Sequence, residues 1–106
     1  MVDWAVQLAL ALQYLHGQTP PVLHLDVKPS NVLLFDVEAK LADFGISKVL
    51  ANTCGTTKGF GATPNYSAPE QMDDDGVVTR ATDVYGLGCV LWELVALRMA
   101  KYLAKV

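Results

Sequence analysis

Three side chains that could act in phosphoryl transfer lie within a short stretch of the sequence, at Asp26, Lys28 and Asn31. Asp26 could accept a proton from a hydroxyl nucleophile, and Lys28 could neutralise charge on a phosphoryl group. Asn31 could offer its carbonyl oxygen to a hard cation such as magnesium. Pro29 disfavours helical backbone at Lys28 and has no N–H, so we expect a shaped loop in which these side chains converge.

The stretch from His24 to Asn31 resembles the catalytic loop of protein kinases, which usually reads His-Arg-Asp-Leu, then three residues, then Asn. His24, Asp26 and Asn31 are in register with that pattern, whereas Leu25 stands where the family usually has arginine. Leu25 thereby removes the cation that would hold a phosphorylated activation loop. We therefore do not expect activation by phosphorylation of that loop.

Two further triplets follow in the order of the kinase family. Residues 43–45, Asp-Phe-Gly, resemble its metal-binding motif, and residues 68–70, Ala-Pro-Glu, resemble the motif that closes its activation segment. Together the motifs extend the resemblance to about Leu97. It implies that Asp26, Lys28, Asn31 and Thr63 serve catalysis, that Lys28, Asn31 and Asp43 contact ATP, and that Asn31 and Asp43 bind Mg²⁺.

The resemblance also implies roles for residues around the loop. A threonine matching Thr63 bridges the residues matching Asp26 and Lys28 in Ser/Thr kinases, and an aspartate matching Asp83 holds the backbone of the catalytic loop. His24 is expected to be structural, packed near Phe44. The glutamate matching Glu70 pairs in the family with an arginine from a later helical region that this sequence does not contain.

The implied activity is transfer of the γ-phosphate of ATP to serine or threonine hydroxyls of proteins. The Pro-Pro turn at 20–21 and the sequence Asn-Tyr-Ser-Ala-Pro-Glu-Gln at 65–71 look most like the tyrosine-kinase-like group of these kinases. No Gly-rich nucleotide loop and no Val-Ala-Ile-Lys-type lysine occur in the sequence. We therefore expect an active parent kinase, but poor ATP binding and no measurable turnover by these residues alone. Two alternatives remain: a pseudokinase-like interaction module, which would have no use for an intact catalytic set, and an inactive truncated fragment.

Composition limits the other partners. The 106 residues carry a net charge of -3 and are 52% hydrophobic, which suits one globular domain and gives no basic patch for nucleic acid. No apolar run reaches the ~20 residues that cross a bilayer, so no membrane partner is expected. Two cysteines without a metal-binding spacing favour a reducing compartment, and we expect a cytoplasmic location.

The elements that must position the loop can be read from periodicity. Residues 3–16 repeat apolar side chains at helical spacing, and Gly17 ends the pattern. A short extended piece at 22–23 leads into the loop, and 32–35 with 39–41 should form a hairpin around a turn at 36–38. The face of the first helix should consist mainly of Val6, Ala9, Leu10, Leu12 and Leu15.

The second half of the chain should contain a surface loop at 46–61 and an acidic loop at 71–76. Thr79 or Thr82 can cap a helix whose stretch from 84 to 97 is apolar almost all round, as in a helix buried on every side. We expect an α+β fold, mainly helical, that is part of a kinase large lobe with a small β-hairpin beside the catalytic loop. The expected domain covers 1–97, and 98–106 has no assignment.

Overall fold

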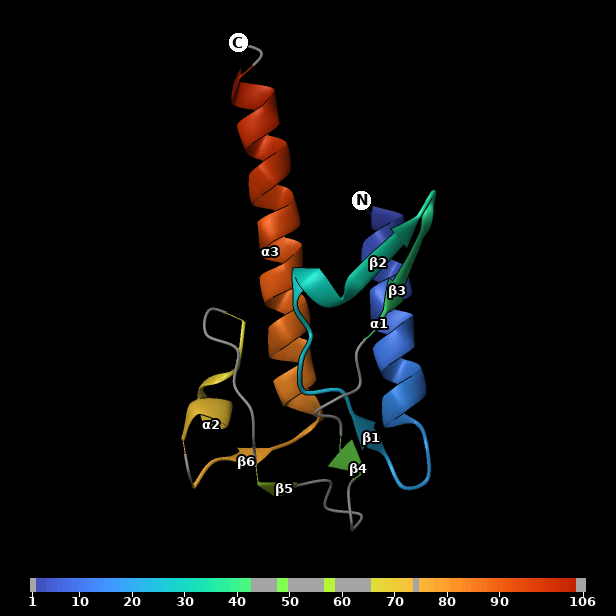
Figure 1. Ribbon diagram of the computed structural model, residues 1–106, viewed down its shortest axis with the longest axis vertical. Helices are drawn as coiled ribbons and strands as arrows, with labels where there is room; N and C mark the ends of the chain where they lie inside the picture. The colour runs from blue at the N-terminus through green and yellow to red at the C-terminus, as the bar shows by residue number, and fades with distance from the viewer. Residues whose placement is uncertain (1, 43–47, 50–56, 59–65, 74, 105–106) are drawn as a thin grey trace.

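The computed structural model describes residues 2–42, 48–49, 57–58, 66–73 and 75–104. These residues form an α+β arrangement dominated by two long antiparallel helices, with short strands and the catalytic loop beside them (Figure 1). The helices are α1 (Val2–His16), α2 (Pro69–Met72) and α3 (Arg80–Ala104), together with one turn of 3₁₀ helix, η1 (Pro29–Asn31).

Helix α1 begins and ends close to the positions expected from its apolar pattern, and the backbone N–H of Gly17 still donates to the carbonyl of Gln13. Its buried face differs from the expected one. Leu8 and Leu12 are almost completely buried, whereas Val6 is 51% exposed and Leu10 is 55% exposed. The prediction is correct for Leu12 but wrong for Val6, Ala9 and Leu10, which are exposed, because apolar residues surround this helix and the sequence alone does not show which side meets α3.

Helix α3 begins at a reciprocal cap. The hydroxyl of Thr79 accepts from the N–H of Ala81, and the hydroxyl of Thr82 accepts from the N–H of Thr79. Both threonines therefore act at the start of α3, as their types suggested. The helix continues through 98–104, so the unassigned tail is largely helical and not a separate segment.

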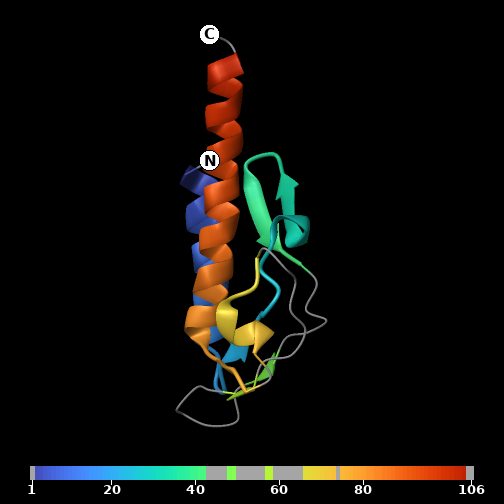
Figure 2. The same ribbon diagram turned by 90° about the vertical axis from the view of Figure 1, so that its left-hand side faces the viewer.

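The apolar middle of α3 is not enclosed on every side within these residues. Val84, Trp92 and Leu97 are 58%, 74% and 57% exposed. Figures 1 and 2 both show the C-terminal part of α3 extending past every other element. The described residues therefore do not surround this stretch of α3, which agrees with the expectation that it is part of a larger kinase lobe.

Three two-stranded antiparallel ladders occur among the described residues. Strand β1 (Val22–Leu23) pairs with β4 (Lys48–Val49), and β5 (Thr57–Lys58) pairs with β6 (Val77–Val78). Strands β4 and β5 fall where the sequence predicted only a surface loop. Two-residue strands carry almost no periodicity, and their partners are distant in sequence, so local pattern could not indicate them.

The hairpin forms as predicted, with β2 (Val32–Phe35) paired to β3 (Glu38–Leu41) and Val32 opposite Leu41. The turn is one residue shorter than expected, and Asp36 adopts a φ of 55° in it. Aspartate is among the residues that tolerate this left-handed backbone. The ladder brings the chain back beside the loop it left: the N–H of Ala42 donates to the carbonyl of Asn31 at 2.8 Å.

The core lies between α1, α3, the catalytic loop and β3. Around it pack further apolar side chains from the same elements and from β2. The buried centre is Leu8, Leu12, Val27, Ala39 and Val90.

Candidate functional site

The catalytic-type loop is extended at Lys28, with φ −152° and ψ 161°, and then makes one 3₁₀ turn beginning at Pro29. This is the conformation that Pro29 predicts, because the residue before proline avoids the helical region. The turn places Asn31 back above Asp26, with the Asn31 side chain buried. The sequence Lys-Pro-Ser-Asn thus folds locally so that three polar side chains return to one place.

Asp26, Lys28 and Asn31 meet as predicted. The Asn31 Nδ2 donates to the Asp26 carbonyl at 2.8 Å and to Asp26 Oδ2 at 3.1 Å, and Lys28 Nζ lies 3.6 Å from the same Oδ2. The side chains of Asp26 and Lys28 are 14% and 24% exposed, so the group sits at the edge of the protein. This arrangement leaves a carboxylate, an ammonium and an amide together where a substrate could reach them.

The Oδ1 oxygen of Asn31 accepts no hydrogen bond from any residue that the structure describes. An amide oxygen beside an aspartate fits a magnesium–nucleotide complex, because magnesium takes oxygen ligands from one or two side chains, phosphates and water. The described residues hold no cluster of three or more His, Cys, Asp or Glu side chains suited to a metal ion. Asn31 and Lys28 are therefore the described residues that could hold such a complex.

Two site residues and one structural residue of the sequence prediction lie outside the described residues: Asp43, Thr63 and Phe44. Ala42, one position before Asp43, makes hydrogen bonds to the loop through both its N–H and its carbonyl group. Its N–H donates to Asn31, and its carbonyl accepts from the His24 ring at 2.9 Å.

His24 is fully buried and structural, as the resemblance implied. Its Nδ1 accepts from the N–H of Asp26 at 3.1 Å, so the ring proton is on Nε2 and is donated to the Ala42 carbonyl. Both ring nitrogens are used in holding backbone. The ring therefore holds the backbone at Asp26 and at Ala42.

Asp83, in the first turn of α3, accepts hydrogen bonds from the backbone of the loop. Its Oδ2 accepts from the N–H of His24 at 2.9 Å, and its Oδ1 accepts from the N–H of Leu25 at 2.8 Å. Its side chain is fully buried. The His16 ring also donates to Oδ2, at 2.7 Å. The role predicted for Asp83 is visible here as bonds, whereas sequence reasoning gave His16 no role.

Leu25, the departure from the kinase pattern, takes a backbone φ of 69° and is 3% exposed. It packs with Leu23 and Val78 in a small separate cluster, and Gln71 Nε2 donates to its carbonyl at 2.8 Å. An apolar side chain thus replaces the usual cation with packing against β6. The sequence predicted Gln71 only as the start of an acidic loop. Its burial and its hydrogen bond to Leu25 depend on helix α2, which the sequence did not predict.

Glu70 has a partner within this chain. Its Oε1 accepts from the Thr82 hydroxyl at 2.8 Å. The next residue, Gln71, accepts from the N–H of Ala68 through its side chain. The bond from Thr82 to Glu70 ties α2 to the start of α3 without the arginine that the resemblance led us to look for, whereas the Gln71 bond stays within the N-terminal cap of α2.

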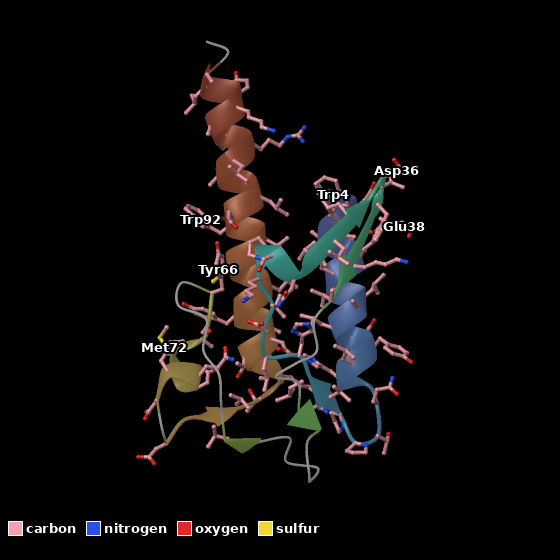
Figure 3. The ribbon with its side chains drawn as sticks, in the orientation of Figure 1. Trp4, Asp36, Glu38, Tyr66, Met72 and Trp92 are labelled. Carbon is pink, nitrogen blue, oxygen red and sulfur yellow. The ribbon has the colours of Figure 1, made fainter. Side chains whose placement is uncertain are left out.

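Tyr66 lies on the side of α3 that faces away from α1, where Figure 3 also places Trp92. The Tyr66 hydroxyl donates to the carboxylate of Glu93 at 3.1 and 3.3 Å. This hydrogen bond raises the pKa of Tyr66 above its ordinary value, with smaller contributions from burial and from the charges of Glu93 and Cys89. The bond links the segment before α2 to α3.

An apolar cavity among the described residues is separate from the polar group. It has a volume of about 170 Å³ and lies between α1, β2 and α3, with Pro29 and Glu93 on its wall. None of Asp26, Lys28 and Asn31 lines it. The candidate site is therefore the edge at Asp26 and not this cavity.

A loop with a carboxylate, an ammonium and an amide at this spacing, hydrogen-bonded to a buried helix aspartate, is the arrangement typical of the protein kinase class. The protein kinase domain family matches residues 1–102. The chain belongs to this family, whose members transfer phosphoryl groups from ATP with the help of divalent metal ions.

Several similar proteins are named as serine/threonine kinases. The chain is 42% identical over 104 residues to receptor-interacting serine/threonine-protein kinase 3 of Rattus norvegicus, an alignment covering 93% of this chain and 22% of the relative. It is 33% identical to serine/threonine-protein kinase Nek11 of Homo sapiens, covering 94% and 15%. It is 37% identical to serine/threonine-protein kinase CTR1 of Arabidopsis thaliana, covering 92% and 12%. The chain thus spans less than a quarter of the length of these relatives.

Within the described residues, no helix combines the length and the hydropathy needed to cross a membrane.

Proposed function

We propose that these residues supply the phosphoryl-transfer centre in the large lobe of a serine/threonine protein kinase, which transfers the γ-phosphate of ATP to protein Ser or Thr hydroxyls. The observation that carries the proposal is the meeting of Lys28 and Asn31 on the Asp26 carboxylate at a solvent-accessible edge. The sequence similarity to named serine/threonine kinases supports the class of substrate. A cytoplasmic location is part of the same proposal.

Each residue has a distinct task in it. Asp26 orients the substrate hydroxyl and accepts its proton, while Lys28 offsets negative charge on the transferring group. Asn31 and Asp43 hold Mg²⁺, and Thr63 bridges Asp26 and Lys28. When bound, Mg-ATP supplies the phosphoryl group. The bond from Asn31 Nδ2 to Asp26 Oδ2 keeps that carboxylate oriented before any substrate arrives.

A chimera tests this function directly. Residues 1–102 would replace the matching region of the rat kinase, and transfer of labelled γ-phosphate to a generic protein substrate would be measured. We expect Mg-ATP-dependent transfer that Asp26→Asn lowers by roughly 10²–10⁴-fold, the contribution typical of a general base. Asp36→Asn is the matched control, because Asp36 is an exposed turn residue in a backbone conformation that asparagine also tolerates.

Two outcomes would contradict the proposal. A folded chimera that transfers no phosphate would show that these residues do not form a competent centre. Transfer unchanged by Asp26→Asn would remove Asp26 from the mechanism. For the 106-residue chain alone we expect poor ATP binding and no measurable turnover, and transfer that Asp26→Asn abolishes would overturn that expectation.

A further inference from the structure

The apolar cavity between α1, β2 and α3, called here the inner cavity, adjoins a second hollow at the outer end of the two long helices. This outer hollow has a volume of about 240 Å³. Trp4, Leu94 and Leu97 line both spaces. Figure 3 places Trp4 at the N-terminal end of α1, and the two leucines lie on successive turns of α3. The two spaces therefore share a wall, along which one elongated molecule can lie.

The inner cavity suits an alkyl chain. Its wall is almost entirely apolar, and water stays in a cavity only where several polar groups bind it. The one charged side chain in the wall is Glu93, whose carboxylate accepts a hydrogen bond from the Tyr66 hydroxyl. The volume of about 170 Å³ is close to the ~150 Å³ of an engineered apolar cavity that binds a small hydrocarbon.

The outer hollow adds two positive charges to this apolar wall. Arg98 and Lys101 line it and lie three positions apart on α3, so they project from the same face of the helix. They continue the line of Leu94 and Leu97 toward the end of α3. Among the described residues, neither cation forms an ion pair with an acidic side chain. Both charges are therefore available to an anion at the outer hollow.

We propose that the two spaces form a binding site for an anionic amphiphile of the medium-chain fatty acid class. The alkyl chain lies in the inner cavity, and the carboxylate binds Arg98 and Lys101. The reverse orientation is unfavourable, because it would bring the carboxylate beside Glu93 in an apolar wall. Asp26, Lys28 and Asn31 line neither space, so this inference does not depend on the proposed kinase function.

Trp4 can report binding, because it lines both spaces. Trp92 lines neither and is 74% exposed, so Trp92→Phe leaves Trp4 as the only tryptophan of the 106-residue chain. Hexanoate, octanoate and decanoate, each below its micelle concentration, should shift the Trp4 emission. Their affinity should rise roughly 3- to 4-fold for each added methylene. Unchanged Trp4 emission with decanoate would overturn the proposal.

Two neighbouring leucines of β2 test whether the alkyl chain enters the inner cavity. Leu34 lines the cavity, whereas Leu33 lines neither space and points to the other face of the strand. They are 50% and 44% exposed, so both phenylalanine variants should keep the circular dichroism of the folded chain. Leu34→Phe should narrow the cavity and weaken decanoate binding roughly tenfold, and Leu33→Phe should leave it unchanged. Equal effects of the two would contradict an alkyl chain in the cavity.

The charge of the head group tests the two cations. Decanol and decyltrimethylammonium carry the same alkyl chain as decanoate, and both should bind more weakly. Arg98→Gln combined with Lys101→Gln should weaken decanoate binding roughly 3- to 10-fold, the range for exposed charges, and leave decanol binding unchanged. Arg80→Gln, at the exposed start of α3, is the matched control. An equal loss for decanol and decanoate would show that the cations do not bind the head group.

Vesicles of phosphatidylglycerol distinguish a site for a single amphiphile from attraction to an anionic lipid surface. We expect no sedimentation of the chain with these vesicles under conditions in which decanoate binds. Sedimentation that the Arg98→Gln and Lys101→Gln pair abolishes, and that Leu34→Phe leaves unchanged, would overturn the proposal in favour of a membrane surface.

Discussion

Two faces of helix α3 differ in burial and in the kinds of residue that they carry. The face toward the catalytic loop carries Asp83, Gly86 and Val90, all buried, while the opposite face carries Tyr85 and Trp92, which are 46% and 74% exposed. The first face combines a buried charge, a residue without a side chain and an apolar contact. The second is apolar but has little packed on it among the described residues.

The contrast shows that apolar composition does not decide which side of a helix supports the site. Gly86 allows the loop to approach, since a Cβ there would lie 2.9 Å from the Val27 carbonyl oxygen. Gly88, two positions on, would gain a Cβ with no atom within 4 Å. The two glycines therefore differ in whether the loop packs against them, although their residue type is the same.

Removing the charge from the loop face should have the largest effect. Asp83→Asn keeps the shape of the side chain but turns its NH₂ group toward a backbone N–H donor. A buried N–H group is then left without an acceptor, which should lower the free energy of unfolding by roughly 3–5 kcal/mol. Urea unfolding followed by circular dichroism measures this. Asp75→Asn, at an exposed acid, should change stability by less than about 0.5 kcal/mol. Equal effects of the two would show that Asp83 does not hold the loop.

The glycine pair gives the next largest contrast. Gly86→Ala should destabilise the protein by roughly 1–3 kcal/mol, because its Cβ would collide with Val27. Gly88→Ala should instead stabilise it by up to about 1 kcal/mol, because alanine favours the helix and meets open space. Thermal unfolding of both variants measures the difference. The same sign for both would mean that α3 does not press on the loop at Gly86.

Replacing one valine on each face of α3 by alanine tests the same difference between the buried and the exposed face. Val90 is 2% exposed and belongs to the core, so Val90→Ala should cost roughly 1–2 kcal/mol through lost burial and a small cavity. Val95 is 45% exposed, and Val95→Ala should change stability by less than about 0.5 kcal/mol. Chemical denaturation compares the two. A larger cost at Val95 would show that other residues cover the exposed face in solution.

The smallest effect concerns the Tyr66–Glu93 contact on the exposed face. The bond raises the pKa of Tyr66 in the folded protein, so its stabilising contribution is present below the unfolded pKa and is lost as pH rises through the folded pKa. Glu93→Gln should lower that pKa toward the ordinary value. Tyrosinate absorbance, with Tyr66→Phe to identify the signal, measures it. An unchanged Tyr66 titration in Glu93→Gln would show that the contact is absent in solution.

The local parts of the site could be predicted because they depend on neighbours in sequence. Pro29 sets the backbone at Lys28, the two strands of the hairpin return the chain from Asn31 to Ala42, and Thr79 caps α3. Each follows from residue chemistry within a few positions. The meeting of Asp26, Lys28 and Asn31 could be foreseen for that reason.

The parts that could not be foreseen depend on distant segments. The bond between His16 and Asp83 spans 67 positions, and the bond from Gln71 to Leu25 spans 46. Nothing local marks either side chain for these partners. Likewise, the choice of Leu8 over Leu10 for the core depends on where α3 lies against α1.

Residue types and backbone sterics within one short segment were enough to predict which polar side chains this protein brings together and that a proline-shaped loop gathers them. Only the tertiary structure decided which face of each helix is buried and which distant side chains hold the loop from below. Burial and long-range hydrogen bonds arise when remote segments meet, and no local spacing determines that meeting.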